Sequence, residues 1–192
     1  MKKIFLLVLL VFIAVKISAQ TQKQNIYSGG MLFFQPGYLN ANNNHQQIKE
    51  ISMGIGGILR FYFFKNFNAG IYGGTQKSNY KTQFSDNSYI NIGYGGAFLG
   101  LSKKIRKIRL NLSIYGGKGS INNLHIENQN NNFLTNAYLY KSPTTIFSPI
   151  ISLDYSLTER ISATLQFVFL NSKFQSKHFS IPIVQLGILF NR

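Results

Sequence analysis

Hydrophobic and polar side chains alternate strictly along residues 108–115. Every even position in this stretch is Ile or Leu, and the odd positions are Arg109, Asn111, Ser113 and Tyr115. A period of two indicates a β-strand, because successive side chains of a strand point to opposite faces. The stretch therefore predicts a strand with one aliphatic face and one polar face.

Similar alternation recurs along the chain, with no convincing helical period and no apolar run as long as a membrane helix. In the segment 89–102 the apolar face is expected to consist of Ile90, Ile92, Tyr94 and Phe98. Pro36 is expected at the outer end of the first strand or at a bulge, because proline cannot donate to a ladder. The pattern predicts eight strands, at residues 27–39, 50–64, 67–76, 89–102, 108–117, 146–157, 160–170 and 181–191.

The connections between these segments alternate in length. Short ones are expected at 65–66, 103–107 and 157–159. Longer polar loops are expected at 40–49, 77–88, 118–145 and 171–180, and the first and third of these are rich in Asn. Short turns at one end and long loops at the other are typical of a transmembrane β-barrel.

The N-terminus indicates export. Two lysines precede an unbroken apolar run at residues 4–15, and Ile17-Ser18-Ala19 then supplies small residues before Gln20. The run would span only about 18 Å as a helix, against a bilayer core of about 30 Å. The sequence therefore predicts a secretory signal peptide at residues 1–19 and a barrel domain at residues 20–192.

Composition separates a membrane barrel from a soluble one. The chain has a net charge of +15, yet only 13% of its residues are charged. The polar faces carry Asn, Ser, Thr, Gly, Tyr and Gln, whereas a water-exposed sheet normally carries Lys and Glu. The apolar faces are therefore assigned to lipid and the polar faces to the barrel interior. A soluble periplasmic lipocalin-like carrier, with the faces reversed, is the alternative.

The whole mature chain, residues 26–192, resembles the small eight-stranded outer-membrane β-barrels of Gram-negative-type bacteria, the OmpX/opacity/OmpA-barrel group. The signal peptide, the eight segments, the rhythm of the loops and the C-terminal VQLGILFNR carry this resemblance. It implies an all-β, antiparallel, up-and-down barrel in the outer membrane, with both termini periplasmic. Phe190 is the C-terminal aromatic of the group, although Asn191 and Arg192 follow it.

Charged and polar residues of the polar faces would meet inside the barrel. An interior charge must be paired or hydrated, and an eight-stranded barrel is only wide enough for side chains. We expect a structural network that fills the interior, and a narrow ion path is the alternative. The predicted network consists of Arg60, Arg109, Asp154, Gln166, Gln185 and Tyr115.

A catalytic role has less support. The three histidines, His45, His125 and His178, all fall in predicted long loops. Two groups could serve a lipid A-modifying enzyme, but their spacing shows no triad geometry, so no catalytic residue is assigned. These groups are Ser120 with His125 and Glu127, and Ser176 with His178.

Other chemistry is limited by composition and export. The chain has no cysteine, which removes thiolate metal sites, and neither a metal nor a cofactor is expected. Export argues against nucleic acid as a partner of the basic turn at 103–107, which is expected to be solvated or to contact anionic headgroups.

We therefore expect a monomer surrounded by outer-membrane lipid and lipopolysaccharide. Its expected role is structural or interactive, in envelope integrity, adhesion or loop-mediated binding, and an extracellular partner would bind the 118–145 loop. Three alternatives are a lipid A-modifying enzyme, a narrow pore and the soluble carrier.

Overall fold

The computed structural model describes residues 27–63, 66–130, 133–174 and 177–191. The predicted signal peptide at 1–19 lies outside the described residues. Within the described ranges, no helix has the length and apolar character needed to cross a membrane.

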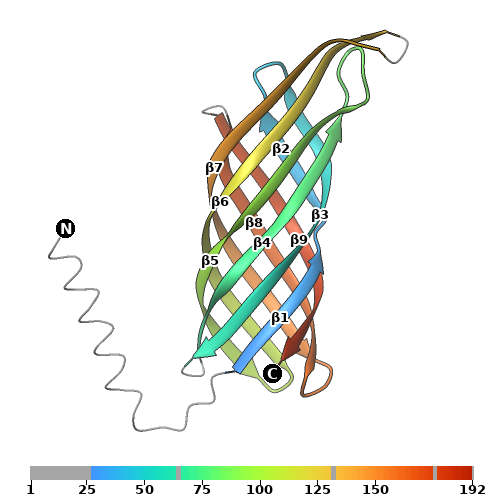
Figure 1. The fold of residues 1–192 in the computed structure, drawn as a ribbon. Coiled ribbons are helices and arrows are strands. Elements are labelled where there is room, and N and C mark those ends of the chain that lie inside the picture. The colour runs from blue at the N-terminus through green and yellow to red at the C-terminus, as the bar shows by residue number, and fades with distance from the viewer. Residues whose placement is uncertain (1–26, 64–65, 131–132, 175–176, 192) are drawn as a thin grey trace, which may run out of the picture.

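The described chain is built from strands (Figure 1). Each strand pairs antiparallel with its neighbours in the sheet. In chain order the strands are β1 (Tyr27–Phe34), β2 (Gly37–Asn42), β3 (Gln47–Phe63), β4 (Phe67–Tyr80), β5 (Ser88–Ile105), β6 (Ile108–Asn130), β7 (Phe133–Ser156), β8 (Ile161–Phe174) and β9 (Lys177–Asn191).

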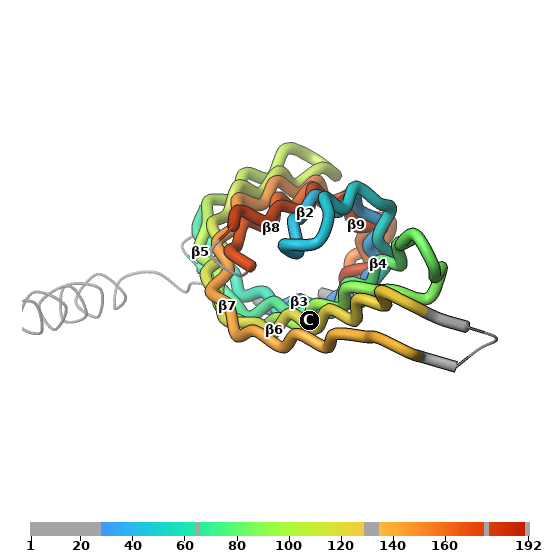
Figure 2. Tube along the Cα trace, turned by 90° about the horizontal axis from the view of Figure 1, so that it is seen from above, coloured from blue at the N-terminus to red at the C-terminus, as the bar shows by residue number. Residues whose placement is uncertain are grey.

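Strands β1 and β2 are two halves of one barrel strand. Both pair with β3 on one side and with β9 on the other, and Gln35 and Pro36 interrupt them. The nine segments therefore form eight barrel strands, and the pairing of β9 with β1 and β2 closes the ring. Figure 2 shows this ring from above. The predicted eight-stranded up-and-down barrel is confirmed.

The outer surface of the ring is apolar. Ile55 on β3 is 68% exposed and Leu112 on β6 is 58% exposed, whereas the alternate positions Ser52 and Asn111 are buried. We call this outer apolar surface the belt. The pattern confirms the predicted facing of the segments 50–64, 67–76, 108–117, 146–157, 160–170 and 181–191.

The predicted facing of segment 89–102 was wrong. Ile90, Ile92, Tyr94 and Phe98 are buried inside the barrel, and Leu99 of the same strand is 71% exposed. In this segment the residues between the apolar positions are mostly small or glycine, so alternation alone does not tell which face meets lipid. The extracellular half of the barrel is lined on its inside by apolar side chains, and the buried residues of this segment pack among them.

The predicted loop at 118–145 was also wrong. Strand β6 runs on to Asn130 and β7 starts at Phe133, with paired residues from Lys118 opposite Thr145 to Asn130 opposite Phe133. Cross-strand pairing satisfies the backbone of polar residues as well as apolar ones, so an Asn-rich composition does not exclude strands. The two strands extend beyond the rest of the barrel at one end (Figure 1). We call the hairpin of residues 118–145 the arm; its first residues, up to Leu124, still pair with β5 in the barrel wall.

The other predicted long loops also shorten. The connection between β2 and β3 is the turn of residues 43–46, and that between β4 and β5 is residues 81–87. Strand β8 continues to Phe174 and β9 begins at Lys177. The end that carries the arm is the extracellular one, because short turns mark the periplasmic end of such barrels.

Substituting Leu112 tests which surface meets lipid. Leu112→Arg places a charge at the middle of the belt, where it should cost about 2–4 kcal/mol of unfolding free energy in phospholipid bilayers. The matched change Leu139→Arg lies on the arm, where the side chain is 69% exposed, and it should cost little. Equal costs, measured by denaturant titration in vesicles, would contradict the assignment of the belt.

Candidate functional site

The barrel interior is arranged in layers between its two mouths. Inward-facing side chains change in character along the axis, from charged near the periplasmic end to apolar near the extracellular end. A cavity lies at the periplasmic mouth and a short turn lies over the extracellular mouth. The interior layers, the cavity and the turn contain polar and titratable side chains, whereas the belt is apolar.

The charged layer, our name for Arg60, Asp154 and the side chains bonded to them, lies toward the periplasmic end. Arg60 Nη1 is 3.0 Å from Asp154 Oδ2, and both side chains are almost fully buried. Arg60 Nη2 donates to Gln166 Oε1 at 3.2 Å. Asp154 also accepts from Asn111 at 2.8 Å and from Thr164 at 2.9 Å. A buried ion pair needs such additional hydrogen bonds to offset the cost of desolvation.

Arg109 lies beside this layer and stacks on Tyr62. Its guanidinium carbon is 4.1 Å from the centre of the Tyr62 ring, a cation–π geometry. The hydroxyl of Tyr62 donates to Asp154 at 3.3 Å. On the sheet, Arg109 is the direct cross-strand neighbour of Asp154. The ring of Tyr62 therefore separates the Arg109 guanidinium from solvent on one face and orients it.

The glutamine–tyrosine layer, which comprises Gln35, Gln185, Tyr72, Tyr94 and Tyr115, lies above the charged layer. Gln35 Oε1 accepts from Tyr94 and from Gln185, both at 2.8 Å. Gln185 also donates to the hydroxyl of Tyr72 at 2.6 Å. Tyr115 packs edge-on against Tyr72, with ring centres 4.9 Å apart. Each member is thus held by a neighbour within the layer.

The two layers are joined by one hydrogen bond. Gln166, which accepts from Arg60, donates through Nε2 to Gln185 Oε1 at 2.7 Å. The structure therefore places five of the six expected network residues in this connected region by hydrogen bonds or ring contacts, and Arg109 adjoins it through Tyr62. Sequence reasoning missed Gln35, whose position at the break beside Pro36 was the available signal.

The apolar layer fills the extracellular half of the interior. Its side chains are buried and come from every barrel strand except β4, which places buried Gln76 and Ser78 at the same height. The side chains of the layer are Leu39, Ile48, Ile90, Ile92, Ile121, Ile146, Leu170, Ile181 and Ile183. This layer separates the polar layers from the extracellular mouth.

The turn of residues 43–46, which we call the lid, lies over the extracellular opening (Figure 2). Asn43 is fully buried and donates to the hydroxyl of Tyr80 on β4 at 3.0 Å. Its Oδ1 accepts from the backbone N–H groups of His45 and Gln46. Gln46 in turn donates to the carbonyl of Lys81 at 2.8 Å. The lid is therefore fastened to the neighbouring strand β4 and the loop that follows it, as well as to its own strands.

His45 of the lid stacks on His125 of β6, which is far from it in the sequence. The rings of His45 and His125 are 4.2 Å apart and nearly parallel. His45 Nε2 lies 2.8 Å from the hydroxyl of Tyr140, and His125 Nδ1 lies 3.2 Å from that of Tyr80. Burial and the neighbouring His45 lower the pKa of His125, while Glu127 acts in the opposite direction. The closed lid therefore favours neutral His125.

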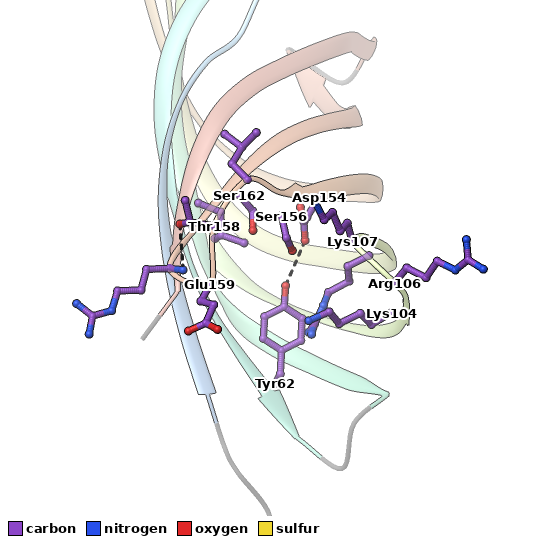
Figure 3. A pocket seen from close by; sticks show the side chains of 13 residues that line it. Tyr62, Lys104, Arg106, Lys107, Asp154, Ser156, Thr158, Glu159 and Ser162 are labelled. Carbon is purple, nitrogen blue, oxygen red and sulfur yellow. Dashed lines mark hydrogen bonds between the residues drawn. The ribbon is translucent and has the colours of Figure 1, made fainter.

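A cavity of about 880 Å³, which we call the vestibule, opens at the periplasmic mouth (Figure 3). The β5–β6 and β7–β8 hairpins form most of its wall, and Tyr62 and Leu189 complete it. Among the described residues, five cations and two carboxylates line it. They are Lys104, Arg106, Lys107, Arg109 and Arg160, with Asp154 and Glu159. Arg106 points away from Tyr62 and Asp154 in Figure 3.

The hydrolase candidates are not brought together. Ser120 and His125 are five positions apart on β6, so they lie on opposite faces of that strand. Glu127 accepts a hydrogen bond from Asn136 of β7. Ser176 lies outside the described residues, and His178 is exposed on β9. Within the described ranges, no three His, Cys, Asp or Glu side chains are grouped to hold a metal ion.

A closed antiparallel ring with an apolar outer surface defines the class of protein. Only closed barrels and helices satisfy every backbone polar group inside a bilayer. The chain is therefore a transmembrane β-barrel of the outer-membrane type, and the polar layers are its interior.

Comparison with solved structures agrees with this class. Ail, the attachment invasion locus protein of Yersinia pestis, matches with a TM-score of 0.56 and 12% identity, over 87% of this chain and 99% of Ail. Neisserial surface protein A matches with a TM-score of 0.57 and 7% identity, over 84% and 96% of the chains. The outer membrane protein OprG of Pseudomonas aeruginosa matches with a TM-score of 0.53 and 10% identity, over 87% and 94%.

At these identities the likeness concerns the fold. No protein-family model and no curated protein sequence matches the chain. The chain has the fold of the small outer-membrane β-barrels, as the resemblance in its sequence indicates, and the outer membrane is its location.

Removing the carboxylate of the charged layer should be costly. Asp154→Asn leaves Arg60 buried without its counter-ion, for which we expect a loss of about 3–5 kcal/mol. The double variant Arg60→Gln/Asp154→Asn removes both charges at similar volume and should recover at least half of that loss. Denaturant unfolding in detergent micelles measures both. A loss below about 1 kcal/mol for the single variant would show that the pair is not desolvated.

The stacked histidines make the lid sensitive to pH. Since the closed lid lowers the pKa of His125, the open form takes up the proton first as the pH falls below about 6.5, and closure weakens. Closure should therefore be strongest above that pH. Titration by NMR should show that His45→Gln raises the pKa of His125, while His178→Gln leaves it unchanged. An unchanged His125 pKa in His45→Gln would refute the coupling.

Proposed function

We propose that this chain is a non-conducting outer-membrane barrel with a structural and interactive role, in envelope integrity, adhesion or binding through its arm. The observation that carries the proposal is the apolar layer. An ion entering from the vestibule would reach Arg60 and the glutamine–tyrosine layer, and would then meet a layer built mainly of buried Ile and Leu side chains. Passage there would require an ion to shed most of its water with few replacement ligands, which is very unfavourable.

The polar layers support a structural interpretation of the interior. The side chains of Arg60, Asp154, Gln166 and Gln185 are buried and bonded to one another or to their neighbours. Such a network links strands on different sides of the ring, since Arg60 lies on β3 and Asp154 on β7. The proposed consequence is a rigid, filled barrel that resists collapse.

Lysines at the extracellular edge of the belt support contact with lipopolysaccharide. On β6 the outward positions run from Ile108 to Lys118, which at about 3.3 Å per residue and a tilt of about 40° covers roughly 25 Å of membrane. Beyond this height the outward side chains include exposed lysines, suited to the phosphates of the outer leaflet. They are Lys49, Lys77, Lys118, Lys141 and Lys173.

The arm supports an interactive role. It is a paired hairpin rather than a loop, and it exposes apolar Leu139 together with Tyr138. An ordered projection costs less entropy on binding than a loop that must become ordered. An extracellular partner would dock on it, and the attachment protein Ail offers a precedent on the same fold. We infer a monomer, because each described barrel strand already pairs on both sides.

The remaining alternatives have less support. A soluble carrier would have to expose the belt to water, although exposed apolar patches of such size mark an interaction surface. A lipid A-modifying enzyme would need a nucleophile near a base, and Ser120 and His125 point to opposite faces. A pore would need a polar path through the apolar layer.

Conductance in planar bilayers tests the proposal. The wild-type protein should give no sustained current steps. The variant Ile92→Ser/Ile121→Ser, which introduces hydroxyls at paired positions of the apolar layer, should give measurable ion steps because water can enter there. The matched pair Leu110→Ser/Leu112→Ser on the belt should stay silent. Regular steps from the wild-type protein would show that the barrel is a pore.

A further inference from the structure

The vestibule collects positive charge on the inner face of one hairpin. Lys104 on β5 and Arg109 on β6 are direct cross-strand neighbours, and both line the cavity. Like charges directly opposite one another destabilise a pair of strands. Lys107, in the turn between them, adds a third cation to the same wall. The barrel therefore places three cations on one wall of the cavity.

The nearest carboxylate is already engaged. Asp154 accepts hydrogen bonds from Arg60, Tyr62, Asn111 and Thr164. This single carboxylate therefore serves four donors, and it also lies opposite Arg109 on the sheet. The other lining carboxylate, Glu159, is exposed on the β7–β8 turn and well hydrated. An excess of positive charge is left in the cavity.

Some of the hydrogen-bond donors that line the cavity are held in place by neighbouring side chains. The Tyr62 ring fixes the plane of the Arg109 guanidinium at 4.1 Å, and Tyr62 is itself bonded to Asp154. Three Ser or Thr hydroxyls line the same space, those of Ser156, Thr158 and Ser162. Figure 3 shows the Tyr62 hydroxyl directed at Asp154, with Ser156, Lys104 and Lys107 nearby. The cavity opens toward the periplasm, because the charged layer lies on its other side.

We propose that the vestibule binds a phosphate-bearing anion from the periplasmic side, with Lys104, Lys107 and Arg109 as its cationic ligands. Phosphate matches this wall because several oxygens and more than one negative charge can meet the three cations together. Arginine forms a planar fork that suits phosphate oxygens, and lysine serves as a point charge. A single carboxylate would leave most of the charge in the cavity uncompensated.

The phosphate could belong to a soluble compound or to the headgroup of an inner-leaflet phospholipid at the rim. Both sources present the same chemistry to the three cations. In either case the bound anion relieves the repulsion between Lys104 and Arg109, so it should stabilise the folded barrel as any ligand of the native state does.

Calorimetric titration of the full chain with pyrophosphate, in zwitterionic detergent that contains no phosphate ester, tests the site. We expect saturable binding to the wild-type protein. The variant Lys104→Gln/Lys107→Gln should weaken it at least tenfold. The matched variant Lys103→Gln/Lys173→Gln removes the same charge from two exposed lysines that do not line the cavity. It should change the affinity less than twofold.

Two results would overturn the proposal: no saturable binding to the wild-type protein, or an equal loss in both double variants, which would mean nonspecific charge attraction. If a variant does not fold, thermal unfolding of the wild-type protein alone still tests the site. Pyrophosphate should raise the wild-type melting temperature more than chloride at equal ionic strength, and equal effects would again overturn the site.

Nanodiscs distinguish the two sources of phosphate. With phosphatidylglycerol in the disc, the apparent affinity for pyrophosphate should fall at least tenfold relative to phosphatidylcholine alone if a lipid headgroup occupies the vestibule. An unchanged affinity would assign the site to a soluble phosphate. A conducting wild-type protein would refute the proposed function but leave pyrophosphate binding measurable, so the two proposals fail separately.

Discussion

The structure depends on closing the ring of backbone hydrogen bonds. Inside a bilayer no water is present to pair with an exposed N–H or C=O group, and each one left unpaired costs several kcal/mol. The pairing of β9 with β1 and β2 removes the last two strand edges. Once the backbone is satisfied in this way, the outer side chains are free to be aliphatic, and the polar side chains must turn inward. The inverted arrangement of the faces follows from closure.

Closure also limits the volume of the interior, because a ring of eight strands leaves little space for side chains. Gly70 illustrates the crowding: a Cβ there would collide with the backbone carbonyl of Leu59 and would lie 2.8 Å from the Phe98 ring. Gln35 lies in the same interior, next to the break at Pro36. It follows the inward-facing Met31 and Phe33 at a period of two, and it binds Tyr94 and Gln185. The regular alternation of the strand thus supplies one connection of the network.

Much of the fold could be predicted from the sequence, because closure forces a period of two wherever a polar interior faces an apolar membrane. Arg60 and Asp154 were placed on inward faces for that reason. The prediction was wrong at Ile90 and Ile92. On this strand the inward positions are mostly apolar and several outward positions are glycine or alanine, so the more apolar face is the one that points into the barrel. The contact between His45 and His125 could not be predicted, since it depends on how the lid folds across the opening and not on spacing along either strand.

The layers give the two mouths different electrostatic characters. The periplasmic vestibule is cationic and adjoins a desolvated ion pair, whereas the extracellular lid holds His and Tyr side chains, with His125 favoured in its neutral form. Between them the apolar layer consists mainly of Ile and Leu side chains, which respond weakly to a change of charge at either mouth. Protonation of the lid and occupation of the vestibule should therefore act independently, unless the wall itself moves. Under the proposed function, the barrel would support two separate surfaces, one in each compartment.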